Sequence, residues 1–161
     1  MMLLMFKVND NRYGINVVDV VEVVPCVPLQ KLPRSPLNIA GLLNYRGNVI
    51  PVIDSSQLLG DSDVRSCLSS RIIMVRSDRM KSCCIGLLAE NVTETIKIDD
   101  DKFTDASIGE GVSALVDKVV LDGMGMLQHI NTARLIPDEL KSFMKAVDAD
   151  GAGSEDVVDA P

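Results

Sequence analysis

Aromatic residues and histidine are scarce in this chain of 161 residues, which contains no Trp, two Tyr, three Phe and one His. A core without large rings must be built from Val, Ile, Leu and Met, and short Val-rich runs with frequent turn signals favour β structure. The one histidine, His129, has no paired nucleophile nearby in the sequence. A structural place in a strand is therefore a better interpretation of His129 than a catalytic one.

Cysteine spacing typical of metal sites is also missing. The four cysteines are Cys26, Cys67, Cys83 and Cys84, and they include no C-x-x-C motif. Because neighbouring residues of a strand point to opposite faces, the adjacent pair makes a poor chelate. Reduced, buried thiols in a cytosolic protein are the expected state.

Motifs that bind calcium or phosphate are absent as well. The loop that starts at Asp99 is acidic, but its sixth position is Thr104, where a calcium loop needs glycine for its sharp turn. Neither a Gly-rich phosphate loop nor an H-E-x-x-H motif occurs. We predict no metal and no cofactor, and no set of residues supports enzyme chemistry convincingly.

Long apolar runs and an excess of positive charge are missing too. No run approaches the ~20 residues of a transmembrane helix, and the apolar residues 1–6 lack the basic leader and cleavage site of a signal peptide. The net charge is −7, but five acidic residues and no basic one lie in the last fourteen residues. The rest of the chain is nearly neutral, which argues against nucleic acid and anionic membrane surfaces as partners. We expect a soluble, cytoplasmic protein with no direct membrane insertion.

Short apolar runs between turn signals predict a mainly β protein with about nine to eleven strands. Strands are expected at residues 2–8, 12–17, 21–24, 39–45, 48–53, 71–76, 82–89, 92–98, 112–121 and 124–130. Short helical turns are expected near residues 18–20, 56–59 and 131–135. Two small closed barrels, or one barrel with a sandwich, would remove the exposed strand edges.

The C-terminal part predicts one amphipathic helix followed by a tail. Pro137 and two acidic residues open a helix over residues 137–147, whose apolar side chains share one face. We favour docking of this helix onto its own barrel over partner binding. Residues 148–161 are too polar to order themselves. The predicted organisation is thus one domain over residues 1–147 and an acidic disordered tail over residues 148–161.

The most informative stretch covers residues 32–54. Pro33 and Pro36 force the chain that precedes them to be extended or turning. Arg46-Gly47-Asn48 is typical of a tight hairpin turn. The strand that follows contains Pro51, which confines it to an edge or a bulge. The sequence thus holds a cation at a turn between two stiff segments, an arrangement that presents a side chain.

Residues 36–54 carry the sequence P-L-N-I-A-G-L-L-N-Y-R-G-N-V-I-P-V-I-D. This closely resembles the pattern P-x-x-I-x-G-x-x-N-x-R-G-x-x-I-P-V-I-D of the chemotaxis coupling-protein family, the CheW-like domain. The resemblance extends over residues 3–136. Tyr45 stands where that family more often has Leu, and together with Leu32-Pro33 and Ile136-Pro137 it is similar to the second coupling protein of Wsp-type surface-sensing pathways.

The resemblance implies two five-stranded barrels that share an apolar core, with no catalytic activity. It implies an adaptor that links the signalling tip of chemoreceptors to the regulatory domain of a histidine kinase, in arrays on the cytoplasmic side of the membrane. Glu22 and Arg46 are implied as an ion pair on the receptor-facing surface, with Glu22 projecting outward from an apolar strand. Val20 and Gly41 fall at positions associated with receptor coupling.

Asn44 and Tyr45, directly before Arg46, complete the predicted receptor- or kinase-binding set. Two alternatives from other classes stay open at this point. One is an enzyme that uses Cys83 or Cys84 with His129. The other is a small-ligand-binding barrel, which would need convergent polar groups where these strands supply mostly Val, Ile and Met.

Overall fold

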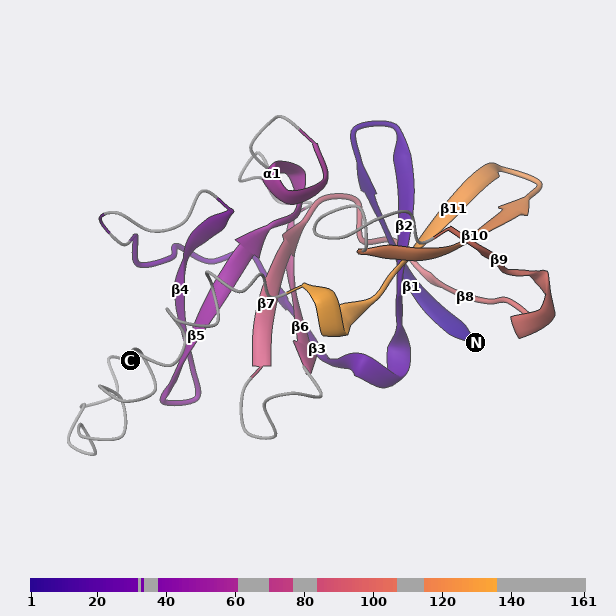
Figure 1. Ribbon diagram of the computed structural model, residues 1–161. Helices are drawn as coiled ribbons and strands as arrows, with labels where there is room; N and C mark the ends of the chain where they lie inside the picture. Colours follow the sequence, from indigo (N-terminus) through magenta and orange to yellow (C-terminus); the bar gives the residue numbers. More distant parts are fainter. Residues whose placement is uncertain (32, 34–37, 61–69, 77–83, 107–114, 136–161) are drawn as a thin grey trace.

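The computed structural model describes residues 1–31, 33, 38–60, 70–76, 84–106 and 115–135, and the strands in these ranges form two sheets that lie side by side (Figure 1). The first sheet contains β1 (Met2–Val8), β2 (Asn11–Asn16), β8 (Thr95–Lys97), β9 (Thr104–Asp105), β10 (Val116–Asp122) and β11 (Gly125–Ile130). The second sheet contains β3 (Val20–Pro25), β4 (Ile39–Tyr45), β5 (Asn48–Asp54), β6 (Arg71–Arg76) and β7 (Cys84–Ala89). The short helices are η1 (Val17–Asp19), α1 (Ser55–Leu59), η2 (Asp100–Lys102) and η4 (Thr132–Arg134).

The second sheet is inserted in the sequence between two parts of the first. The strand orders are β8-β1-β2-β11-β10-β9 and β3-β6-β7-β5-β4. Neighbouring strands are antiparallel except for one parallel pair in each sheet, β2 with β11 and β5 with β7. Both ends of the described chain therefore contribute to the first sheet, and the middle of the chain forms the second.

Three groups of buried apolar side chains form the interiors of the two halves and the contact between them. The interior of the first half contains Leu3, Met5, Ile98, Val120 and Leu127. The interior of the second half contains Leu43, Ile50, Val52, Ile72, Met74 and Leu88. A larger cluster draws on both sheets and includes Phe6, Ile15, Ile53, Ile73, Leu87 and Ile130.

Strands whose two faces are both apolar supply this arrangement. In β6, Ile72 and Met74 face the interior of the second half, while Ile73 and Val75 face the shared cluster. Period-two alternation sends successive side chains to opposite faces, so one strand serves two cores. The Val- and Ile-rich runs of the sequence are thus explained by burial on both sides.

The segment after β3 closes the second sheet into a barrel. Gln30 and Leu42 exchange two backbone hydrogen bonds, with N···O distances of 2.9 and 2.8 Å. Leu42 lies on β4, which is the last strand of the sheet, whereas the chain has come from β3, which is the first. This bridge covers the exposed edge of β4 and brings the two ends of the sheet together.

The predicted fold class is confirmed: the protein is mainly β, with two halves and a shared apolar core. The first half has six strands where the resemblance implied five, because the two-residue strand β9 adds to the edge of β10. Residues 2–8 and 71–76 form strands with the predicted bounds. None of the helices in the described ranges has the length and apolar character needed to cross a membrane.

One predicted strand is shorter than expected. Residues 92–98 alternate in polarity, but only Thr95–Lys97 form regular strand. Residues 93 and 94 contact β1 outside the regular ladder: Met5 N donates to Glu94 O at 2.9 Å and Thr93 N donates to Met5 O at 3.3 Å. The described residues do not include the first residues of the strand predicted at 112–121, the predicted helix at 137–147 or the predicted tail.

Candidate functional site

The hairpin between β4 and β5 turns through two residues in the left-handed region. Arg46 has φ 52° and Gly47 has φ 83°, the combination expected of a type I′ turn. The Asn44 side chain supports the turn, since its Oδ1 accepts a hydrogen bond from the Gly47 N–H at 3.1 Å. The predicted turn is therefore confirmed, with Arg46 rather than Asn48 in the left-handed conformation.

This conformation is unfavourable for arginine. A residue with a Cβ held in the left-handed region costs about 1–3 kcal/mol, and asparagine tolerates it better. The hairpin would thus be more stable with the Asn-Gly sequence that type I′ turns prefer. Arg46 is not the residue that the fold itself would select at this position.

Glu22, Tyr45 and Arg46 form one contact group, which we call the Glu22 cluster. The Tyr45 hydroxyl donates a hydrogen bond to Glu22 Oε2. Arg46 Nη2 lies 3.5 Å from the same oxygen, and the two charged side chains are 75% and 40% exposed, respectively. The Arg46 guanidinium also lies over the Tyr45 ring, 5.1 Å from its centroid, within the range of a cation–π contact. The implied ion pair is present, and the tyrosine is part of it.

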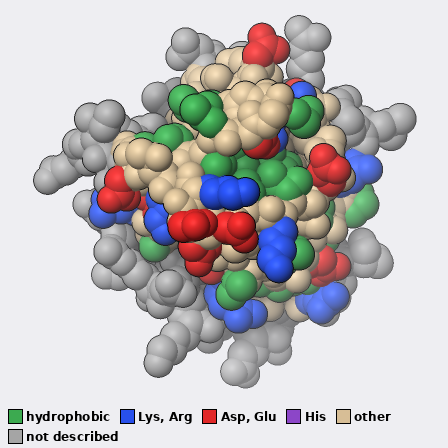
Figure 2. All heavy atoms as spheres, turned by 90° about the vertical axis from the view of Figure 1, so that its right-hand side faces the viewer, with side chains coloured by type: hydrophobic (Ala, Val, Ile, Leu, Met, Phe, Trp, Pro, Cys, Tyr) green, Lys and Arg blue, Asp and Glu red, His purple; other side chains and the backbone are tan. Residues whose placement is uncertain are grey.

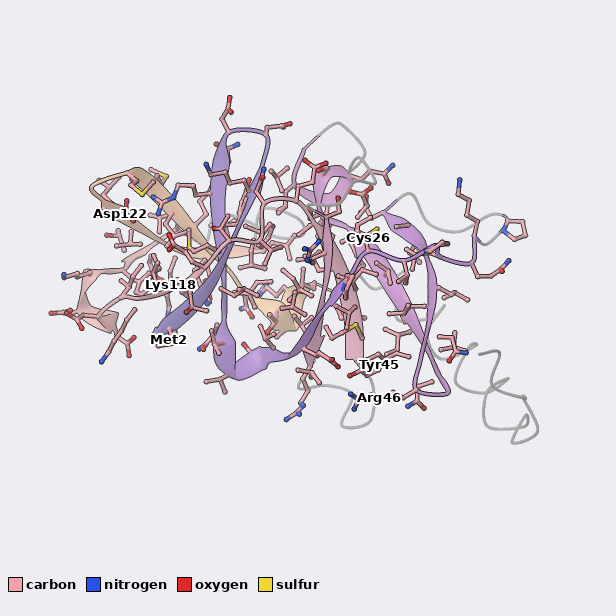
Figure 3. The ribbon with its side chains drawn as sticks, turned by 180° about the vertical axis from the view of Figure 1, so that it is seen from behind. Met2, Cys26, Tyr45, Arg46, Lys118 and Asp122 are labelled. Atoms are coloured by element: carbon pink, nitrogen blue, oxygen red, sulfur yellow. The ribbon has the colours of Figure 1, made fainter. Side chains whose placement is uncertain are left out.

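The cluster lies where the two ends of the second sheet meet. Glu22 comes from β3 and Tyr45 from the end of β4, strands at opposite ends of the sheet order. Tyr45 packs against the apolar interior of the second half. Figure 3 shows Tyr45 and Arg46 together at the tip of the β4–β5 hairpin, on the side of the molecule away from Asp122. The cluster therefore sits at a rim of the second barrel.

The outward projection predicted for Glu22 does not set it apart from its neighbours. The Glu22 side chain is 40% exposed, and Val21 and Val23 on either side of it are exposed to a similar degree, at 39% and 38%. A register shift lies between Val20 and Glu22, and such a shift disturbs the regular alternation of a strand. The strand thus presents two valines to solvent beside the charged cluster.

The other two predicted site residues occupy structural positions. Val20 is half-buried and packs against the shared cluster. Gly41 is buried beneath the segment that closes the barrel: a Cβ there would lie 2.7 Å from Leu29 Cβ and 2.9 Å from the Gln30 carbonyl oxygen. The structure therefore brings together Glu22, Tyr45 and Arg46, with Asn44 at the same turn, but not Val20 or Gly41.

Comparison with known proteins identifies the family. The family model of the CheW-like domain matches residues 2–140. This chain belongs to the CheW-like domain family. The chemotaxis protein CheW of Rhizobium meliloti (strain 1021) is 30% identical over 98 residues, which is 61% of each chain. The CheW of Thermotoga maritima is 23% identical over 101 residues, 63% of this chain and 64% of the relative.

The fold agrees with that of a solved member. The crystal structure of the scaffolding protein TtCheW from Thermoanaerobacter tengcongensis matches with a TM-score of 0.75 and 28% identity, covering 86% of this chain and 89% of the other. The matches to the two curated relatives span 61% and 64% of their own lengths. The predicted membership of the CheW-like family and the predicted β-rich fold are thus confirmed.

Most of the CheW-like motif in this chain has a structural explanation. Asp54 is buried and caps α1, with its Oδ1 accepting hydrogen bonds from Ser56 N at 2.9 Å and Gln57 N at 3.3 Å. Pro51 lacks an N–H, and β5 pairs with β7 only from Val52 onward among the described residues, so no ladder bond is lost there. Gly41 allows the close approach of Leu29 and Gln30, and Gly47 allows the left-handed conformation of the turn. Of the motif residues that the structure describes, Arg46 is the one that the fold leaves unexplained, and Pro36 lies outside the described ranges.

The alternative enzyme site gains no support from the geometry. His129 is buried, and its Nδ1 lies 2.6 Å from Asp117 Oδ1. Its Nε2 is buried without a hydrogen-bond partner in the described ranges. His129 lies on β11 of the first sheet, whereas Cys84 belongs to β7 of the second. Among the residues that the structure describes, no three His, Cys, Asp or Glu side chains could share a metal ion.

A second exposed region lies on the first half of this CheW-like domain. Leu121, Met124 and Met126 at the β10–β11 hairpin are 74%, 75% and 52% exposed. A surface hollow of about 330 Å³ beside Met124 is also lined by Arg12 and Glu94. Figure 2, which views this half of the molecule, shows acidic and basic side chains interspersed with apolar ones on the described part of the face. Such a mixed surface does not resemble a nucleic-acid site.

Proposed function

We propose that this chain is a non-catalytic adaptor that couples the cytoplasmic tip of a chemoreceptor to the regulatory domain of a histidine kinase. The observation that carries the proposal is the strained, exposed Arg46 at the β4–β5 turn. The names of the similar proteins, chemotaxis protein CheW and a scaffolding protein, support a role of this kind. The protein would act in the cytoplasm, on arrays of membrane-bound receptors, without a cofactor.

The stability of the fold does not explain why position 46 is an arginine. An exposed ion pair contributes about 0–1 kcal/mol, which does not exceed the backbone cost of a left-handed arginine. A charge fixed at a rigid turn instead favours partner choice and register. The two exposed valines of β3 flank Glu22 and supply apolar area that a helical receptor tip could cover.

The test is co-sedimentation with membranes that carry a receptor signalling domain, in the presence of the kinase regulatory domain. Arg46→Asn is the informative variant, because Asn-Gly is a better type I′ turn. We expect this variant to keep or raise the melting temperature while losing receptor-dependent assembly. Arg46→Glu should lose assembly with the melting temperature nearly unchanged. Lys97→Glu, an equal charge reversal on exposed β8, is the control and should sediment like the parent.

Two results would contradict the proposal. The first is a parent protein that binds neither the receptor tip nor the kinase domain at micromolar concentrations. The second is an Arg46→Asn variant that assembles normally, which would leave Arg46 without a role in coupling. Binding each partner separately shows which of the two contacts needs Arg46.

We further propose Tyr45 as the feature that favours a Wsp-type surface-sensing coupling protein over a motility one. Tyr45 replaces the more usual Leu of the family and contacts both charged residues of the Glu22 cluster. The same assay with receptor tips from surface-sensing and from motility arrays separates the two. Preference for the motility receptor would remove this finer assignment.

A further inference from the structure

Two arginine–carboxylate pairs in this protein have the same chemistry and different geometry. Arg12 and Asp122 form two hydrogen bonds, Nη1 to Oδ1 at 2.7 Å and Nη2 to Oδ2 at 2.8 Å. Arg46 and Glu22 approach only to 3.5 Å, through one nitrogen and one oxygen. The first pair is closed in the parallel two-bond manner that guanidinium and carboxylate prefer, and the second is open.

The Glu22–Arg46 pair also involves Tyr45, which contacts both charged groups. Glu22 Oε2, the oxygen nearest Arg46, already accepts the hydrogen bond of the Tyr45 hydroxyl. The ring of the same tyrosine holds the guanidinium over its face, at 5.1 Å from the centroid. Tyr45 thus uses one acceptor position of the Glu22 carboxylate and holds the Arg46 guanidinium over its ring.

We propose that Tyr45 is a positioning residue that keeps Arg46 available to a partner by preventing its closure onto Glu22. The inference rests on the proposed adaptor function and adds the chemistry of the partner group. A guanidinium that is 75% exposed and stacked on a ring keeps hydrogen-bond donors directed outward. The group that fits it is a carboxylate on the partner surface, taken in the two-bond manner that Glu22 does not provide.

The proposal also states what a leucine at position 45 would change. A leucine at position 45 has no hydroxyl for Glu22 and no ring face for Arg46, so the pair would be free to close. Tyr45 therefore adjusts the strength of the partner contact, and the contact itself belongs to Arg46.

The first experiment needs no partner. Tyr45→Phe keeps the ring and removes only the hydroxyl, and nitrogen-detected NMR of the arginine side chains reports how freely each guanidinium rotates. In the parent, we expect slow rotation for Arg12 and fast rotation for Arg46. In Tyr45→Phe, Arg46 should slow toward the behaviour of Arg12, which is the reference in the same spectrum. Unchanged Arg46 rotation in this variant would overturn the proposal.

The second experiment measures partner affinity for Tyr45→Phe, Glu22→Gln and the double variant. Tyr45→Phe should weaken binding of the receptor tip by roughly 3- to 10-fold, which lies in the lower part of the range for coupled neighbouring residues. Adding Glu22→Gln should restore binding relative to Tyr45→Phe alone, because a neutral amide does not compete for Arg46. If Tyr45 instead contacts the partner directly, Glu22→Gln should not restore binding. A double variant that binds no better than Tyr45→Phe would therefore refute the positioning role.

The two experiments separate this inference from the proposed function. If the parent fails to bind any receptor tip while Arg46 rotation responds to Tyr45→Phe, the adaptor function is wrong and the positioning geometry stands. If the parent binds and neither rotation nor rescue responds, the positioning role is wrong and the adaptor function stands. Melting temperatures of all variants show that each is folded at the temperature of measurement.

Discussion

Arg12 and Asp122 lie 110 positions apart in the sequence and are joined by two short hydrogen bonds between β2 and β10. β11 lies between these two strands in the first sheet, so the pair spans a third strand. The side chains are 12% and 30% exposed, respectively. The hydrogen bond from Arg12 is the main cause that lowers the pKa of Asp122 from 3.8 to about 2, with a further backbone hydrogen bond from Met124.

This pair predicts that part of the free energy of unfolding is lost in acid. Because the folded-state pKa of Asp122 is below its ordinary value, the ionised pair stabilises the fold above pH 4. That contribution is lost as the pH falls from about 4 through 2. Asp122→Asn keeps an oxygen for the Met124 N–H and removes the charge. We expect it to lower the unfolding free energy by about 1 kcal/mol at pH 6, measured by urea denaturation. The difference from the parent should vanish near pH 2, and a constant difference across this range would contradict the assignment.

Gly41 provides a second prediction, about the closure of the second barrel. A methyl group at this position would clash with Leu29 and with the backbone of Gln30, so Gly41→Ala should lower stability by about 1–3 kcal/mol. Gly123→Ala is the matched control, since nothing lies within 4 Å of a Cβ there. Amide exchange at Leu42 should accelerate in Gly41→Ala alone. Loss of receptor coupling in this variant would then be an indirect effect of an opened barrel rather than of a lost contact.

The shared apolar cluster predicts that the two halves unfold together. Ile73 is fully buried in that cluster, and Ile73→Ala should cost about 2–5 kcal/mol. Val49→Ala, at a position that is 48% exposed, should stay within about 0.5 kcal/mol of the parent. Backbone probes in β1 and β6 should report one common midpoint for Ile73→Ala. Separate midpoints for the two probes would show that the halves are independent units.

The exposed valines of β3 predict that a substitution there lowers the affinity for a partner but leaves the stability of the fold almost unchanged. Val23→Ser replaces a side chain on the outer face of β3, so the unfolding free energy should change by about 0.5 kcal/mol or less. If a receptor tip covers this face, its affinity should fall several-fold. Val18→Ser, at a position that is 83% exposed outside the strand, serves for comparison. Equal affinity for the parent and Val23→Ser would exclude this face from the interface.

Local patterns account for what the sequence predicted correctly. A continuous apolar run predicted the strand at residues 71–76, and Arg46-Gly47 predicted the hairpin turn, because both depend on neighbours in the chain. The cap formed by Asp54 is also local. Such features can be predicted without knowing what packs against them.

Long-range partners account for what the sequence did not predict. Three contacts join segments that are distant in the sequence and have no local pattern to reveal them. They are the parallel pairing of β2 with β11, the two backbone hydrogen bonds between Gln30 and Leu42, and the hydrogen bond from Tyr45 to Glu22. The Glu22–Arg46 pair was available only through family resemblance. The exposure of Val21 and Val23 beside Glu22 was not predicted, because the register shift in β3 arises from its pairing with β6.

The insertion of one sheet within the other has a consequence for biosynthesis. The pairings of β3 to β7 use only residues 20–89, so this half can assemble while the ribosome is still making the remainder. β2 must wait for β11, whose residues pair with it at Leu127, Gln128 and His129. The N-terminal hairpin is therefore made first and completed last, and until then it has an open edge that a nascent-chain chaperone could cover.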